Sequence, residues 1–107
     1  MLQEAQSADQ QVAIQLKNDR ERYAELGARL RTTPPSSILT VARGSSDHAA
    51  NYCAYLIMAR LGRIVASLPM SLVTLNKAPL IARDALAIAI SQSGQSPDVV
   101  EPIRYFR

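Results

Sequence analysis

The chain has 107 residues, of which 48% are hydrophobic and 20% are charged, a composition typical of a single globular domain with a modest core. The formal net charge is +3, but no basic stripe is interleaved with aromatic residues, so we expect no nucleic-acid partner. The apolar runs are strand-sized and no secretory signal pattern opens the chain, so we expect no membrane span. The single cysteine favours a reducing compartment, and we expect a cytoplasmic protein.

The first predicted element is one long amphipathic helix over about residues 9–31. Apolar residues recur there at helical spacing, charged residues cover the other faces, and Asp19 interrupts the apolar stripe. Thr32-Thr33-Pro34-Pro35 ends the helix. We therefore assign residues 1–35 to a helix and a connector that precede an α/β domain of residues 36–107. The apolar stripe consists of Val12, Leu16, Tyr23, Leu26 and Leu30.

The second predicted unit is a strand, a turn and a helix. Ser37 to Ala42 is apolar enough for a buried strand, Arg43-Gly44-Ser45-Ser46 is its turn, and a helix runs from Asp47 until Gly62 stops it. A glycine and paired serines thus lie between the carboxyl end of a strand and the start of a helix. The predicted buried face of that helix consists of Ala50, Cys53, Ala54, Ile57 and Leu61.

A second strand is predicted from Ile64 to Leu68, and Pro69 opens a short helix or turn that reaches about Leu75. The segment from Asn76 to Asp84 is a connection.

The third predicted strand, Ala85 to Ile90, runs directly into the polar segment Ser91-Gln92-Ser93-Gly94-Gln95-Ser96-Pro97-Asp98. Ser96 has the side-chain oxygen of a helix N-cap, Pro97 suits the first helical position, and Asp98 complements the helix dipole. This segment predicts a site for a small anion. The anion would be held by serine hydroxyls, by backbone N–H groups freed by Gly94 and by the positive end of the helix, without lysine or arginine from this segment. An ordinary strand-to-helix turn is the alternative for any one such loop.

The order of elements predicts an α/β fold, a three-layer doubly wound parallel sheet with strand order 2-1-3. That order places the first and third strands side by side. The two glycine- and serine-containing loops then converge on one crevice at the carboxyl ends of these strands.

Two other reactive side chains have simpler interpretations. Cys53 lies on the predicted buried helix face, where a lone cysteine is usually packing. His48, the only histidine, lacks the partners that a metal site requires. We expect neither a metal ion nor a cofactor.

The two loops carry a resemblance. Ala42-Arg43-Gly44-Ser45-Ser46, followed about 45 residues later by Ser91-Gln92-Ser93-Gly94-Gln95-Ser96, resembles the sugar isomerase (SIS) domain family. Within that family it resembles in particular the isomerase half of glucosamine-6-phosphate synthases and the stand-alone glucosamine-6-phosphate deaminases. The resemblance runs from about Ser37 to Arg107 and implies a truncated, flavodoxin-like SIS fold. It also implies that Ser91, Gln92, Ser93 and Ser96 hold the phosphate of a sugar phosphate, and that Gly44, Ser45 and Ser46 line the sugar side.

Departures from the family pattern indicate which members of the family this chain resembles in function. The synthases have a cysteine at the position of Arg43 and a threonine at the position of Ser96. Serine keeps the hydroxyl group of threonine, so the expected phosphate binding is retained. Leu2 follows Met1, where the synthases have a nucleophilic cysteine, and this favours the isomerase or deaminase relatives. Family members carry two such domains, with the catalytic base in the second, and form homodimers. The resemblance therefore implies that this chain binds a hexose or hexosamine 6-phosphate and contains no catalytic residue.

Three interpretations stay open from the sequence. The chain is the amino-terminal part of a phosphosugar isomerase or deaminase, or it is a non-catalytic module that senses sugar phosphates, or it binds nothing. In the last case, the apolar edge from Ala85 to Ile90 would favour dimerisation or aggregation.

Overall fold

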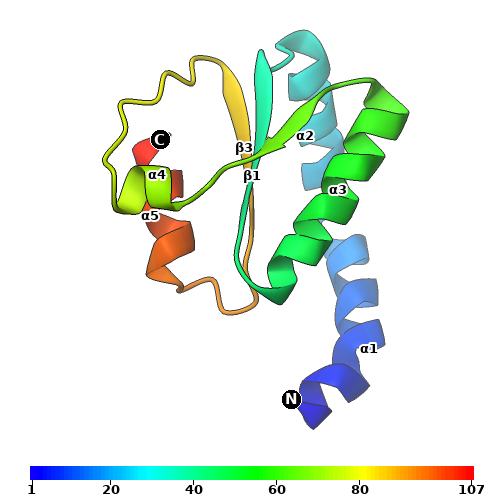
Figure 1. Ribbon diagram of the computed structural model, residues 1–107. Coiled ribbons are helices and arrows are strands. Elements are labelled where there is room, and N and C mark those ends of the chain that lie inside the picture. Colours follow the sequence, from blue (N-terminus) through cyan, green and yellow to red (C-terminus); the bar gives the residue numbers. More distant parts are fainter. The chain divides into compact units, whose positions relative to one another are not determined.

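The computed structural model describes all 107 residues, and they form two compact units, Met1–Pro34 and Pro35–Arg107 (Figure 1). The first unit holds two helices and the second holds a small α/β domain. The helices of the first unit are α1 (Leu2–Asn18) and α2 (Arg20–Thr32). The elements of the second are β1 (Ser37–Ala42), α3 (Ser45–Leu61), β2 (Val65–Ser67), α4 (Ser71–Thr74), β3 (Ala85–Ile90) and α5 (Pro97–Tyr105).

The prediction of one long amino-terminal helix was wrong in two respects. Helical structure begins at Leu2, and it is interrupted at Asp19, where φ is −101° and ψ is 8°. Aspartate has a low helix propensity because its short side chain competes for nearby hydrogen bonds. Here the carboxylate of Asp19 lies 3.8 Å from the guanidinium of Arg22, in the first turn of α2.

The apolar stripe of these helices does not form a core. No residue of α1 or α2 is buried, and Val12, Leu16, Tyr23 and Leu26 are all exposed. One side-chain hydrogen bond joins the two helices across the interruption, from Nε2 of Gln15 to the hydroxyl of Tyr23 at 3.1 Å. Helical spacing thus predicted the helices, but it did not determine whether their apolar side chains are buried.

The three strands form a parallel sheet in the order β2-β1-β3, which confirms the predicted α/β class and topology. The observed β1 and β3 have the predicted bounds. The observed β2 is shorter than predicted at both ends, since it contains neither Ile64, which is exposed, nor Leu68, which is buried in the core. Strand β1 is central, and in its register with β3 Ser37 lies opposite Ala85 and Ala42 opposite Ile90.

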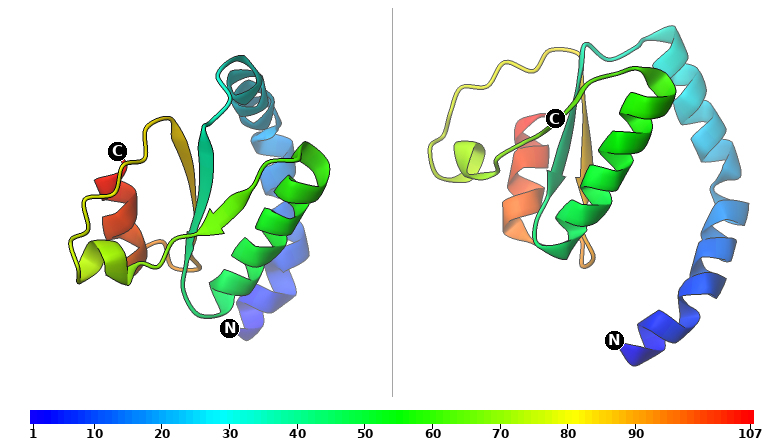
Figure 2. Two further views of the ribbon diagram at one scale, coloured as in Figure 1. Left: turned by 45° about the horizontal axis from the view of Figure 1, so that its top comes forward. Right: turned by 45° about the vertical axis from the view of Figure 1, so that its right-hand side comes forward.

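Helices cover both faces of the sheet (Figures 1 and 2). Helix α3 packs on one face, and α5 packs on the other with α4 beside it. Because side chains alternate along a strand, Val41 of β1 faces the α5 side, where it forms the buried core with Leu68, Val73 and Val99. The core is aliphatic, as in any domain with so few aromatic residues.

On the opposite face, α3 approaches the sheet through small side chains. Ala50 and Ala54 are buried, whereas Cys53 and Ile57 are partly exposed. The predicted burial of Leu61 was wrong, since its exposed fraction is 68%. Leu61 is the last residue of the helix, and Gly62 turns the chain there with a left-handed φ of 63°.

Side-chain hydrogen bonds to the backbone fasten the long connection before β3. The hydroxyl of Tyr105 in α5 donates to the carbonyl oxygens of Ala78 and Leu80, at 3.2 and 3.4 Å. Oγ of Ser36 donates to the carbonyl oxygen of Arg83 at 2.7 Å. These bonds tie the connection to α5 and to the segment before β1, so that β3 enters the sheet beside β1.

Candidate functional site

The carboxyl ends of β1 and β3 lie side by side, since Ala42 is opposite Ile90. A cavity of about 210 Å³ lies between the loops that follow these two strands. Seven of its lining residues are the seven that the sequence singled out, so the structure brings both loops together in one place. The lining consists of Arg43, Gly44, Ser45, Ser46, Ile90, Ser91, Gln92, Ser93, Ser96 and Val99.

The first loop is shorter than predicted, because α3 begins at Ser45. Gly44 makes the turn with φ of 61° and ψ of −134°, and its carbonyl oxygen accepts from the backbone N–H of Asp47 at 3.1 Å. Ser45 and Ser46 therefore occupy the first turn of α3. Backbone N–H groups in a first turn have no partner within the helix, and they carry the positive end of its dipole. This wall of the cavity offers hydrogen-bond donors.

The second loop is held by its own serine side chains. Oγ of Ser91 accepts from the backbone N–H of Gly94 at 3.1 Å, and Oγ of Ser93 accepts from that of Gln95 at 3.2 Å. The backbone N–H groups of Gly94 and Gln95 are therefore used within the loop. Each hydroxyl uses its oxygen within the loop and keeps its own hydrogen for another acceptor. These two serine hydroxyls are donors that the loop still offers.

Ser96 lies at the N-cap of α5, as predicted, but its side chain does not cap the helix. Its carbonyl oxygen accepts from the N–H groups of Val99 and Val100, both at 3.0 Å, and Pro97 occupies the first helical position. Its hydroxyl makes no capping bond and its residue lines the cavity. Ser96 thus adds a hydroxyl to the cavity.

Sequence reasoning missed an ion pair at the cavity. The guanidinium of Arg43, which follows β1, pairs with the carboxylate of Asp98 in the first turn of α5. The exposed fractions of the two side chains are 68% and 42%. The sequence predicted an anion site held without lysine or arginine from the loop after β3, and it assigned Asp98 only to the helix dipole. No local pattern marks the pair, because its members are 55 residues apart.

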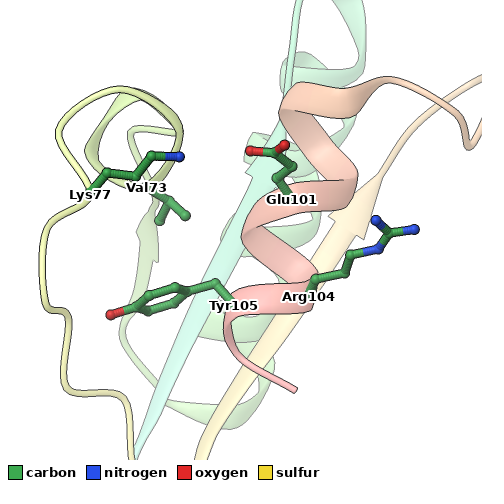
Figure 3. A pocket seen from close by; sticks show the side chains of 5 residues that line it. All are labelled: Val73, Lys77, Glu101, Arg104 and Tyr105. Carbon is green, nitrogen blue, oxygen red and sulfur yellow. The ribbon is translucent and has the colours of Figure 1, made fainter.

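A second cavity, of about 370 Å³, lies beside α5 (Figure 3). Its polar groups do not all converge on one point. The side chains of Lys77 and Glu101 point toward each other, whereas Arg104 extends away from them. The hydroxyl of Tyr105 is already bonded to Ala78 and Leu80. The smaller cavity between β1 and β3, with donors from two loops, is therefore the better candidate site.

Other reactive side chains lie elsewhere. His48 is exposed on α3, Cys53 is a partly buried free thiol, and neither lines the cavity. No group of three or more histidine, cysteine, aspartate or glutamate side chains has a geometry that could hold a metal ion. None of the helices combines the length and the apolar character needed to cross a membrane.

Comparisons with known proteins place this geometry in a family. The family model of the SIS domain matches residues 33–107. A protein from Silicibacter pomeroyi DSS-3, assigned as a phosphosugar isomerase, has a similar crystal structure, with a TM-score of 0.82 and 43% sequence identity. The match covers 87% of this chain but 28% of that protein, so the chain spans less than a third of its length. A search of curated proteins found no match.

Proposed function

The chain belongs to the SIS domain family, and we propose that it binds a sugar phosphate in the cavity between β1 and β3. The observation that carries this proposal is the convergence of two polar loops on one cavity of about 210 Å³. The loops are distant in the sequence, and residues of both line the cavity. The similarity to the Silicibacter protein supports the same ligand class.

The phosphate is assigned to the loop after β3. Ser91, Ser93 and Ser96 offer hydroxyl hydrogens, and Gln92 offers an amide. The positive end of α5 lies directly after this loop, and a helix N-terminus favours an anion. The donors of this loop are neutral, which suits a ligand that must leave again.

The sugar is assigned to the loop after β1, where Gly44, Ser45 and Ser46 form the facing wall. The cavity, at about 210 Å³, is smaller than the roughly 300–1,000 Å³ of a pocket that encloses a whole small molecule. It therefore takes the phosphate and the adjoining part of the sugar. A hexose or hexosamine 6-phosphate, with its phosphate at one end, suits such a half-site.

We further propose that this chain supplies binding groups and not the catalytic base of an isomerase or deaminase. Moving a proton between neighbouring sugar carbons requires a positioned general base. No residue that lines the cavity carries a carboxylate, an imidazole or an amine, although Asp98 lies at its rim. In this proposal the base comes from a part of a larger enzyme outside these 107 residues.

Calorimetric titration and thermal unfolding of the full chain test the proposal. Fructose 6-phosphate should bind and raise the unfolding temperature, and fructose should not. At ten times Kd the ligand should add about 1.4 kcal/mol to the free energy of unfolding. Ser93→Ala should weaken binding, whereas Ser71→Ala, at the exposed start of α4, should not. Equal effects of fructose and fructose 6-phosphate would contradict the proposal.

A further inference from the structure

We infer that Arg43 binds the phosphate of the ligand directly, and that it does so by exchanging its partner Asp98 for the phosphate. This inference rests on the proposed sugar-phosphate function and assigns to that site a charged residue and a competing carboxylate. In this inference the phosphate takes the place of Asp98 beside the guanidinium of Arg43.

The position of the pair supports an exchange. Arg43 follows the last residue of β1 and itself lines the cavity. Asp98 lies in α5 between Ser96 and Val99, which both line the cavity, while Asp98 does not. The pair thus joins the two loops at the rim. A long, exposed arginine side chain that reaches a rim carboxylate needs only side-chain rotation to reach an anion in the cavity.

The charges of the site also support an exchange of Asp98 for phosphate. Arg43 is the only charged residue that lines the cavity. A phosphate monoester carries about −1.5 to −2 charges at pH 7, whereas a carboxylate carries one. A planar guanidinium also binds phosphate oxygens with two parallel hydrogen bonds. The ligand is therefore a stronger partner for Arg43 than Asp98 is.

The exposure of the pair makes the exchange inexpensive. With exposed fractions of 68% and 42%, both side chains reach water. Exposed ion pairs contribute little to stability, so little is lost when this one opens. Asp98 nevertheless competes for the guanidinium, and its negative charge opposes that of the phosphate. We expect Asp98 to lower the affinity for the ligand and so to favour its release.

The inference predicts opposite effects for the two members of the pair. In calorimetric titration of the full chain with fructose 6-phosphate, Asp98→Asn should tighten binding about fivefold, because it removes a competitor. Arg43→Gln should weaken binding about tenfold or more, because it removes a charged donor. In the double variant, Asp98→Asn should give a smaller gain than it does alone. Arg43→Lys should bind with intermediate affinity, because it keeps the charge but not the fork.

Matched controls separate these effects from a change in net charge. Glu101→Gln removes a carboxylate from the exposed side of the same helix, and Arg63→Gln removes an exposed guanidinium outside the cavity. Each should change Kd less than twofold, roughly the size of a screened long-range charge effect. Circular dichroism should show that all variants keep the fold.

A second readout follows Arg43 itself. In NMR of the labelled chain, titration with inorganic phosphate should shift the side-chain Nε–H signal of Arg43. Asp98→Asn should lower the phosphate concentration at which half of this shift is reached. If Asp98→Asn weakens binding as Arg43→Gln does, the pair only shapes the site, and the inference fails. If Arg43→Gln binds as the unsubstituted chain does while Ser93→Ala weakens binding, this inference alone fails. If the unsubstituted chain binds no phosphate compound, the proposed function fails with it.

Discussion

The backbone N–H of Gly94 donates a hydrogen bond to Oγ of Ser91 at 3.1 Å, and this bond closes the loop that follows β3. A second bond of the same kind joins Gln95 to Oγ of Ser93 at 3.2 Å. Both serines thus hold the loop with their oxygens and keep their hydrogens for an acceptor in the cavity. The same side chains shape the candidate phosphate site and serve as its donors.

The turn at Gly94 leads to a first prediction. Gly94→Ala should lower the free energy of unfolding by about 1–2 kcal/mol, because φ at this position is 66° and a side chain disfavours that region. A Cβ atom at Gly94 would meet nothing within 4 Å, so the cost is one of backbone conformation alone. Urea denaturation measures it.

Gly27→Ala is the control for that substitution. Gly27 lies inside α2 and has no positive φ, so alanine should raise helix stability by about 0.5–1 kcal/mol there. Unchanged stability of Gly94→Ala would contradict the conformation described for this loop.

The two glycines that flank α3 should differ in their sensitivity to substitution. Gly62 has left-handed angles, with φ of 63° and ψ of 20°, so Gly62→Ala should cost about 1 kcal/mol. Gly44 has φ of 61° but ψ of −134°, a combination that is nearly restricted to glycine, so Gly44→Ala should cost about 3 kcal/mol. Parallel urea titrations compare the two variants, and a larger effect at Gly62 would refute this ranking.

Val99 links the core to the site, because it belongs to the buried cluster and also lines the cavity. Its exposed fraction is 5%, and Val99→Ala should lower the free energy of unfolding by about 2 kcal/mol through lost burial and a new void. Ile81→Ala, at a side chain that is 89% exposed, should change it by less than about 0.5 kcal/mol. Similar losses in the two variants would contradict the assignment of the core to the α5 face.

The interruption at Asp19 gives a prediction for the amino-terminal unit. Asp19→Ala removes the side chain that lies 3.8 Å from Arg22 and introduces the strongest helix former. The helical signal in far-ultraviolet circular dichroism should increase. Asp9→Ala, inside α1, should change it less because that residue is already helical. An unchanged signal for Asp19→Ala would mean that the interruption does not depend on this side chain.

Much of the α/β domain could be predicted from local patterns. The strands β1 and β3 have the predicted bounds because each is an uninterrupted apolar run between polar or turn-forming residues. The order β2-β1-β3 follows from parallel strands joined through helices, whose handedness leaves few topologies. That order in turn predicts that the loops beginning at Arg43 and Ser91 meet, and the structure brings them to one cavity.

Local patterns could not decide what depends on neighbours distant in the sequence. Helical spacing marked Leu61 and the stripe of α1 and α2 as apolar, but burial requires a facing surface, which spacing within one helix does not specify. A serine at a helix start can cap the helix or face a cavity, and only the path of the chain decided that Ser96 does the second.

The sequence by itself thus determined the strands, their order and the two polar loops, because these follow from patterns within a few residues and from the chirality of the connections. Only the tertiary structure decided the charges of the site. Arg43 and Asp98 are 55 residues apart, and they pair because the sheet sets the end of β1 beside the start of α5. A contact between exposed side chains leaves no periodic or apolar pattern in the sequence. It could therefore be identified only in the folded structure.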